Sequence, residues 1–330
     1  MLIVMTLAVA LTTAFLIDAA RLDPGPAWVE QYHYTTDPAA RLLTFGDGQF
    51  YGMIAQDPTL SRPEAIIPSG DRAGELAYRA MRPGFAWGAW ALSLGRPELV
   101  PAVLIVLTAG SVAVLYEGVR RLAAALGRDP RVAAAAIMLP GVVRLLGWTG
   151  PEIAAAGAAC LAVAAAARDE PRRAAGILVI AVLLRESLLL VALGLFLSGR
   201  MRARQAVVPL AALLGWATVV CLRLGTRPAD GQRLELLGLL EAAIDWGTFE
   251  WLSFLLLGVL MAVTARQGRF GAALVAPHLA MLLVMAPITG VLEGFSRIML
   301  PMYALGLAFA APAARPRGTD APVTPVVAAA

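Results

Sequence analysis

One carboxylate stands out in a chain that is otherwise mostly apolar. Residues 45–58 read FGDGQFYGMIAQDP, so Asp47 lies between Gly46 and Gly48 and is followed by two aromatic residues. A carboxylate can take a proton from a hydroxyl group as a general base, and glycines on both sides would leave room beside it for a substrate. Asp is also a preferred N-cap for a short helix such as the one these residues predict. Both interpretations stay open at this point.

Arginine is the other residue type with useful chemistry, and it supplies all 27 basic residues of the chain. Its guanidinium group binds phosphate through two parallel hydrogen bonds. Arg79 and Arg82, in LAYRAMRPG, are three residues apart, a spacing that places them on one face of a helix. Arg297, in FSRIMLP, is expected at the same membrane surface. All three suit a lipid headgroup phosphate, although arginines that merely extend toward the membrane surface are placed in the same way.

Three further charged residues lie within or beside apolar segments. Residues 174–198 carry Arg185 and Glu186 at their centre, and charges at that depth cost roughly several kcal/mol unless they are paired or face a wet cavity. A structural ion pair and a cavity-lining role are both consistent with them. Glu152, in GWTGPEIAAA, opens an apolar segment, where a carboxylate at a helix start needs no function.

The elements that must position these groups are transmembrane helices. The chain is 59% hydrophobic and 15% charged, whereas soluble domains carry about 25% charged residues. Apolar runs of transmembrane length recur along it. The sequence therefore predicts an all-α polytopic membrane protein with about eight full spans. The expected spans are 2–17, 99–116, 132–148, 152–167, 206–222, 250–265, 271–288 and 298–314.

Arginine clusters between the spans predict the orientation of the chain, because such clusters stay in the cytoplasm. All of them remain on one side only if residues 174–198 enter and leave the membrane from that side. We therefore expect a hairpin of two half-helices that breaks at Arg185 and Glu186, where protein or water must cover the irregular backbone.

This threading places both termini in the cytoplasm and makes residues 1–314 a single transmembrane domain. Residues 18–98 form a first external loop that contains Asp47, and residues 223–249 form a second one. Within the first loop, a short Trp-bearing segment, 83–95, is expected to lie on the outer membrane surface as an interfacial helix. Residues 315–330 are expected to be a disordered cytoplasmic tail.

Common catalytic motifs are missing from the sequence. It contains no GxxxxGK[ST], HExxH or GxSxG pattern, and its two histidines, His33 and His278, are far apart. We expect no cofactor, and nothing supports a divalent metal. The basic balance does not indicate a nucleic-acid partner, because the arginines fall mostly at membrane edges.

Taken in order, these features resemble the GT-C superfamily, integral-membrane glycosyltransferases that use polyprenyl-phosphate-linked sugars, and especially its smaller bacterial mannosyltransferase-like members. Gly48 departs from the pattern, because many members carry a second acidic residue there, and this argues against a metal held by paired carboxylates. The matching segments, spread over about residues 1–312, are GDGQFYGMIAQDP, YRAMRP, TGPE, LLRES and SRIMLP.

The resemblance implies transfer of mannose or another hexose or pentose from a polyprenyl phosphate to an envelope glycan or glycolipid. The reaction would take place on the extracytoplasmic side of a bacterial inner (plasma) membrane. Asp47 would be the general base. The implied phosphate-binding residues are Arg79, Arg82, Arg185 and Arg297, and the supporting residues are Gly46, Gly48, Tyr51, Glu152 and Glu186.

Two other functions remain compatible with the sequence. A transporter or flippase for a lipid-linked substrate would use the same arginines, but it would not need Asp47. A non-catalytic membrane assembly partner would need neither.

Overall fold

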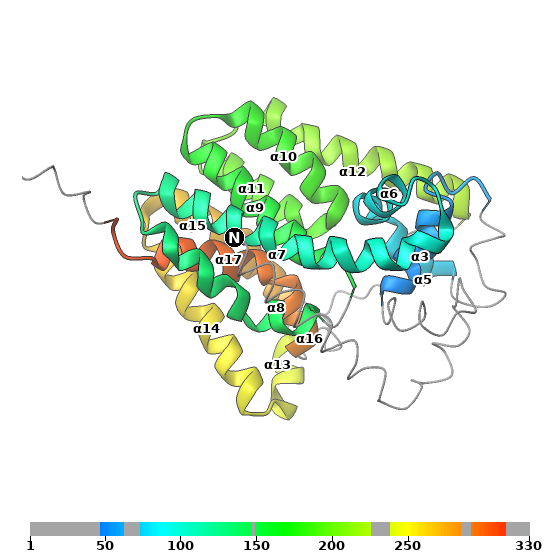
Figure 1. The fold of residues 1–330 in the computed structure, drawn as a ribbon. Helices are drawn as coiled ribbons and strands as arrows, with labels where there is room; N and C mark the ends of the chain where they lie inside the picture. Colours follow the sequence, from blue (N-terminus) through cyan, green and yellow to red (C-terminus); the bar gives the residue numbers. More distant parts are fainter. Residues whose placement is uncertain (1–46, 63–72, 147–148, 226–237, 285–291, 315–330) are drawn as a thin grey trace, which may run out of the picture.

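The computed structural model describes residues 47–62, 73–146, 149–225, 238–284 and 292–314. Within these ranges every regular element is an α-helix or a 3₁₀ helix, as the composition predicts (Figure 1). The predicted first span, 2–17, residues 18–46 and 63–72 of the first loop, residues 226–237 of the second loop and the tail 315–330 lie outside the described residues.

Three of the described helices are long and apolar enough to cross a membrane: α7 (Val100–Ala125), α12 (Ala203–Leu224) and α14 (Thr248–Ala265). Large apolar side chains on α12 and α14 face outward, including Leu214 (56% exposed) and Leu255 (63% exposed). A surface of this kind is suited to lipid rather than to water. Other apolar helices in the described ranges are shorter, and they include α9 (Glu152–Ala167), α15 (Gly268–Leu283) and α17 (Leu300–Ala310).

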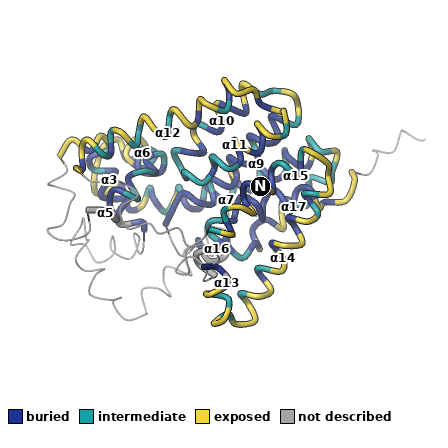
Figure 2. Tube along the Cα trace, turned by 180° about the vertical axis from the view of Figure 1, so that it is seen from behind, coloured by how far each residue is buried: buried dark blue, intermediate teal, exposed yellow. Residues whose placement is uncertain are grey.

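The alanine-rich helix α9 lies at the centre of the larger apolar core. It packs against α7, α10 (Pro171–Leu184) and α17. Almost all of its residues are buried (Figure 2). A Cβ atom added to Gly118 of α7 would lie 2.4 Å from the carbonyl oxygen of Gly157 in α9. The two backbones therefore touch, which is the small-residue packing that membrane helices use. This contact fixes the helix that begins at Glu152.

A second, smaller apolar core gathers α3 (Gly48–Gln56), α5 (Ala73–Ala80) and α6 (Pro83–Leu92) at one end of the molecule (Figure 1). The helix α6 occupies the segment predicted to be interfacial, but its two tryptophans behave differently. Trp90 is 46% exposed. Trp87 donates its indole N–H to the Pro58 carbonyl at 2.9 Å and packs edge-on against Trp216. Only Trp90 is therefore placed as a surface anchor.

The expected span 132–148 is not one continuous helix. Residues Pro130–Met138 form a 3₁₀ helix, η3, and Pro140–Leu145 form the short helix α8. The physical reason is Pro140, which disfavours the helical conformation at the residue before it. Leu139 is accordingly extended, with φ −61° and ψ 137°, and the apolar run is divided into two short helices in series.

The break predicted in residues 174–198 is present. The helix α10 ends at Leu184, Arg185 is extended with φ −157°, and the chain continues as η4 (Glu186–Leu188) and α11 (Leu189–Leu197). Beyond the two ends of this segment, Arg200 Nη1 lies 2.6 Å from Asp169 Oδ1. The chain therefore returns to the level at which it started.

The arginine clusters within the described residues share one end of the molecule. Arg168 donates to the Arg121 carbonyl at 3.4 Å, Arg128 to Gln267 at 3.1 Å, and Arg269 to the Leu197 carbonyl at 3.2 Å. The remaining described elements are η2 (Pro97–Leu99), α13 (Gly238–Ala242), η5 (Ala243–Asp245) and α16 (Leu292–Ile298).

Candidate functional site

Seven charged residues singled out from the sequence meet where the two apolar cores join, and we call this group the ion cluster. Three come from the smaller core and the segments beside it, and four come from the larger helical bundle. Its members are Asp47, Arg79, Arg82, Glu152, Arg185, Glu186 and Arg297.

Asp47 precedes α3 but does not cap it. Its backbone is helical, with φ −66° and ψ −22°, and its side chain makes no capping hydrogen bond. The carboxylate instead accepts from Arg79 Nε at 2.8 Å and from Arg297 Nη2. The capping interpretation is therefore wrong, and this carboxylate, only 5% exposed, belongs to the ion cluster.

Arg79 and Arg82 do not lie on one helical face as predicted. The helix α5 ends at Ala80, because Pro83 disfavours helical backbone at the residue before it. Arg82 adopts φ −111° and ψ 61° and turns toward the larger bundle. Its Nε and Nη2 atoms donate to the two carboxylate oxygens of Glu186 at 2.8 and 2.7 Å, a bidentate pair of the strong kind.

Arg185 and Glu186 each form an ion pair, as one of the two interpretations of these charges expects, but with distant partners rather than with each other. Glu186 accepts hydrogen bonds from Arg82, while Arg185 Nη1 donates to Glu152 Oε1 at 2.6 Å. The same oxygen accepts from Arg297 Nε at 2.7 Å. The extended backbone at Arg185 lets two adjacent side chains reach different partners. Glu152 is thus a junction for arginines from α10 and α16.

The ion cluster is largely buried. Its described members are four arginines and three carboxylates, of which Glu152, Arg82 and Arg185 are at most 3% exposed. Arg79 and Arg297 are the more accessible arginines, with side chains 20% and 18% exposed. These two are therefore the arginines of the ion cluster that a ligand reaches most easily.

Several buried polar atoms in this region have no hydrogen-bonding partner among the described residues. They are Tyr51 Oη, Glu152 Oε2, Arg185 Nε and, beside Glu186, Ser187 Oγ. Orphaned buried groups are rare in folded proteins, and each costs about 1–3 kcal/mol. The part of the chain that the structure describes has no such orphan elsewhere. Unused hydrogen-bonding capacity is therefore concentrated at the ion cluster.

Burial and charge act in opposite directions on Asp47. Burial by itself would raise its pKa, but the positive charges of Arg297 and Arg79 together outweigh burial and hold the pKa well below its usual range. Burial raises the pKa of Tyr51 well above its ordinary value, so this phenol stays neutral. Asp47 is consequently ionised, and it is a weak base while both arginines hold it.

Comparison with known proteins finds no matching family model, no matching curated protein and no matching solved structure.

The expectation that the glycines beside Asp47 leave room for a substrate can be compared with the structure at Gly48 but not at Gly46. Gly46 lies outside the described residues. A Cβ atom added to Gly48 would lie 2.7 Å from the Thr149 Cβ atom, so the space beside Gly48 is filled by protein. It does not leave room for a substrate as expected. Tyr51 is fully buried and packs edge-on against Phe85, with ring centroids 5.6 Å apart.

Two aromatic contacts of the ion cluster were missed in the sequence. The Arg82 guanidinium lies 4.3 Å from the Tyr78 ring centroid and donates to the Tyr78 hydroxyl. Arg79 lies 4.2 Å from the Phe50 ring centroid. Tyr78 belongs to α5, but Arg82 lies beyond the end of that helix with non-helical backbone. Helical spacing in the YRAMRP segment therefore does not account for this contact.

The residues of the ion cluster are poorly suited to a metal. Among the described residues, no three His, Cys, Asp or Glu side chains are grouped so that they could hold a metal ion. The carboxylates of the ion cluster all accept hydrogen bonds from arginine instead. What the arrangement offers chemically is an ionised carboxylate beside cationic hydrogen-bond donors.

Proposed function

We propose that this chain is a membrane glycosyltransferase. It would transfer a sugar from a polyprenyl-phosphate carrier to a hydroxyl group of an envelope glycan or glycolipid. The observation that carries the proposal is the ion cluster itself, in which Asp47, just before α3, meets arginines that are distant in the sequence. The likeness of the ordered sequence segments to GT-C enzymes supplies the reaction class.

The proposed reaction is a displacement at the anomeric carbon. The acceptor oxygen forms a bond to this carbon while the bond between the carbon and the phosphate oxygen of the carrier breaks. The polyprenyl phosphate leaves with the electron pair, and the acceptor proton passes to Asp47. Arginines close to the phosphate stabilise the charge that develops on it. Atoms and charge balance without any cofactor.

Arg79 and Arg297 are the arginines best placed for that phosphate, because they are the most exposed of the four. Both also hold Asp47. A donor phosphate that attracts these two guanidinium groups would weaken their hold on the carboxylate and raise its basicity. Arg82 and Arg185, which are buried against Glu186 and Glu152, would position the site rather than bind the donor.

The placement of the ion cluster fits a lipid-linked donor. It lies at the end of α10, and the arginine-rich end of the molecule lies at the start of the same helix, about 21 Å away. The positive-inside rule then assigns the ion cluster to the external surface. This topology, with about eight spans of a GT-C-like fold in a bacterial inner membrane, is part of the proposal.

The test compares Asp47→Asn with Asp57→Asn in a transfer assay. Asp57 is a matched control, because it is also 5% exposed and lies at the other end of α3. The probes are polyprenyl phosphates that carry tritiated mannose or a tritiated pentose, with membrane vesicles as the source of acceptor. We expect turnover to fall at least about 100-fold in Asp47→Asn and to change little in Asp57→Asn.

Donor binding separates a catalytic role from a structural one. In Asp47→Asn the donor should bind at least as tightly as in the wild type, because the negative charge of Asp47 no longer competes with the donor phosphate for Arg79 and Arg297. A collapsed site would lose binding and turnover together. Full turnover in Asp47→Asn would refute its role as the base.

One observation favours a non-catalytic assembly partner, namely that every arginine of the ion cluster already holds a carboxylate. A structural network of this kind would bind no lipid phosphate. A chain that binds neither donor yet co-purifies with a fixed partner would support that function. Movement of donor across liposomes without any acceptor would instead indicate a flippase.

A further inference from the structure

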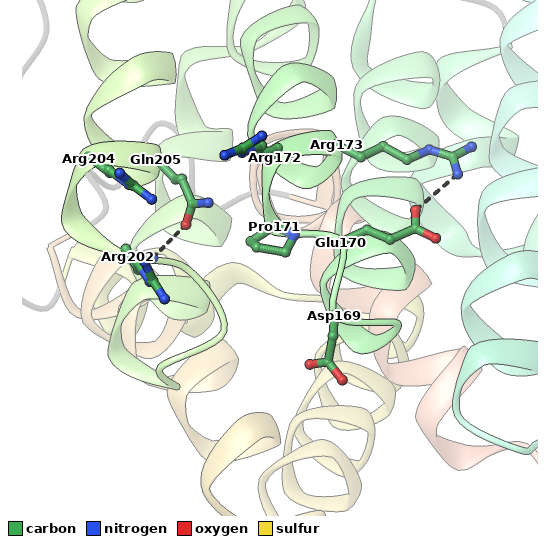
Figure 3. A pocket seen from close by; sticks show the side chains of 8 residues that line it. All are labelled: Asp169, Glu170, Pro171, Arg172, Arg173, Arg202, Arg204 and Gln205. Atoms are coloured by element: carbon green, nitrogen blue, oxygen red, sulfur yellow. Dashed lines mark hydrogen bonds and ion pairs between the residues drawn. The ribbon is translucent and has the colours of Figure 1, made fainter.

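An open cavity of about 460 Å³ lies far from the ion cluster, at the other end of α10. It is formed where the first turns of α10 and α12 come together (Figure 3). Arginine is its commonest lining residue, and the four are Arg172, Arg173, Arg202 and Arg204. Nothing in the proposed transfer reaction uses this cavity.

The acidic residues that line this cavity each form an ion pair with an arginine. Glu170 accepts from Arg173 at 3.0 Å, and Asp169 accepts from Arg200 at 2.6 Å. Figure 3 shows Arg173 extending toward Glu170 and away from the other three lining arginines. The positive charge of those three is therefore left over.

Arg172, Arg202 and Arg204 form no ion pair with any residue that the structure describes. Arg172 belongs to the first turn of α10, Arg202 immediately precedes α12 and Arg204 belongs to the first turn of α12, and all three line the cavity together with Gln205 (Figure 3). Guanidinium groups converging from separate elements can bind the oxygens of a single phosphate. The cavity thus presents a three-arginine site for an anion.

The surface next to the cavity is apolar. On α12, Val208, Ala211 and Gly215 follow Arg204 at helical spacing and are all exposed. The nearest surroundings of Gly215 are open, with no atom within 4 Å of an added Cβ. This helix is one of those long enough to span a membrane. A ligand with its head in the cavity would therefore find a smooth apolar strip for a hydrocarbon chain.

We propose that this cavity binds the phosphate of an anionic phospholipid, with an acyl chain along the strip of α12 that carries Val208, Ala211 and Gly215. Basic pockets between membrane helices suit such headgroups. A soluble phosphate would use the arginines but not the strip. The proposal is independent of Asp47, so lipid binding should be unaffected in Asp47→Asn.

The test measures lipid binding to the purified full-length protein by native mass spectrometry. The probes are dioleoyl phosphatidylglycerol, its dihexanoyl analogue, dioleoyl phosphatidylcholine and inorganic phosphate. We expect the dioleoyl anionic lipid to bind most tightly. Replacing Arg172, Arg202 and Arg204 together by Gln should weaken its binding on the order of 100-fold, about fivefold for each arginine.

The matched control replaces Arg128, Arg131 and Arg269 by Gln, which removes the same charge from the same end of the molecule but outside the cavity. This variant should retain nearly full binding. Equal losses in both variants would indicate general surface attraction and overturn the proposal. Equal affinity for inorganic phosphate or for the dihexanoyl lipid would overturn the role of the strip. Replacement of the three cavity arginines by Lys should restore part of the binding, which excludes misfolding as the cause.

Discussion

At the scale of single residues, the carboxylates of the ion cluster act as junctions rather than as members of simple pairs. Glu152 Oε1 accepts from Arg185 and Arg297, and Asp47 accepts from Arg79 and Arg297. Arg297 therefore connects two carboxylates from different helices. A change at any one of these groups alters the electrostatics of several others, so their effects should not be additive.

The low pKa of Asp47 predicts how its contribution to stability depends on pH. Its carboxyl is harder to protonate in the folded chain than in the unfolded chain, where its pKa is about 3.9. The unfolded state therefore binds the proton first, and the stability that Asp47 contributes is present above about pH 5 and lost as pH falls below about 4. The gap in thermal unfolding temperature between wild type and Asp47→Asn should be constant from pH 8 to 5 and shrink below pH 4.

A gap that already changes between pH 8 and 6 would contradict this prediction, because it would require the pKa of Asp47 to lie well above its ordinary value. The comparison is internally controlled, since the variant differs from the wild type only in the group that titrates.

The sequence predicted which residues would matter at this scale better than it predicted their partners. Asp47 reaches Arg79 across 32 residues and Arg297 across 250. Local rules pointed instead to a helix cap for Asp47 and named no partner for Arg185 or Glu186. Partner choice here is decided by tertiary packing, and spacing along the chain carries no signal for it.

At the scale of elements, prolines and close backbone contacts decide where side chains point. The short helix over 48–56 followed from local chemistry, and the break at Arg185 followed from the side on which the arginine clusters lie; both are present. One helix over 132–148 was predicted incorrectly, because its apolar run concealed the effect of Pro140. Apolar length alone therefore does not show whether a segment is one continuous helix.

The glycine contact between α7 and α9 gives a prediction about how Glu152 is positioned. Gly118→Ala should push these helices apart, because its Cβ would lie 2.4 Å from the Gly157 carbonyl oxygen. We expect a loss of about 1–3 kcal/mol in the free energy of unfolding. The control is Gly110→Ala on the same helix, where an added Cβ meets no atom within 4 Å and alanine favours the helix.

Chemical denaturation of both variants in detergent measures the difference. Equal stability of Gly118→Ala and Gly110→Ala would contradict the close packing of the two backbones. Reduced donor binding in Gly118→Ala alone would further link this contact to the ion cluster.

At the scale of the whole molecule, the charged residues gather in two separate regions of the helical bundle. The ion cluster joins the two apolar cores, while the arginine clusters, including the cavity between α10 and α12, gather at the other end. The apolar faces of α12 and α14 extend over the length of these helices. Each end would therefore meet a different membrane surface, and the two proposed sites would act on lipids of opposite leaflets.

Cysteine labelling can test this arrangement without removing any arginine. In a background of Cys160→Ala and Cys221→Ser, single cysteines replace Thr59, near the ion cluster, or Ala124 or Gln267, near the arginine clusters. All three positions are exposed. A membrane-impermeant maleimide should label Thr59→Cys in intact cells, and the other two only after permeabilisation. Ala124 precedes and Gln267 follows the broken segment 174–198, so a single span there would place them on opposite sides. The contact between Asp169 and Arg200 brings the two ends of this segment to one level, so under the proposed topology we expect Ala124 and Gln267 to share one side.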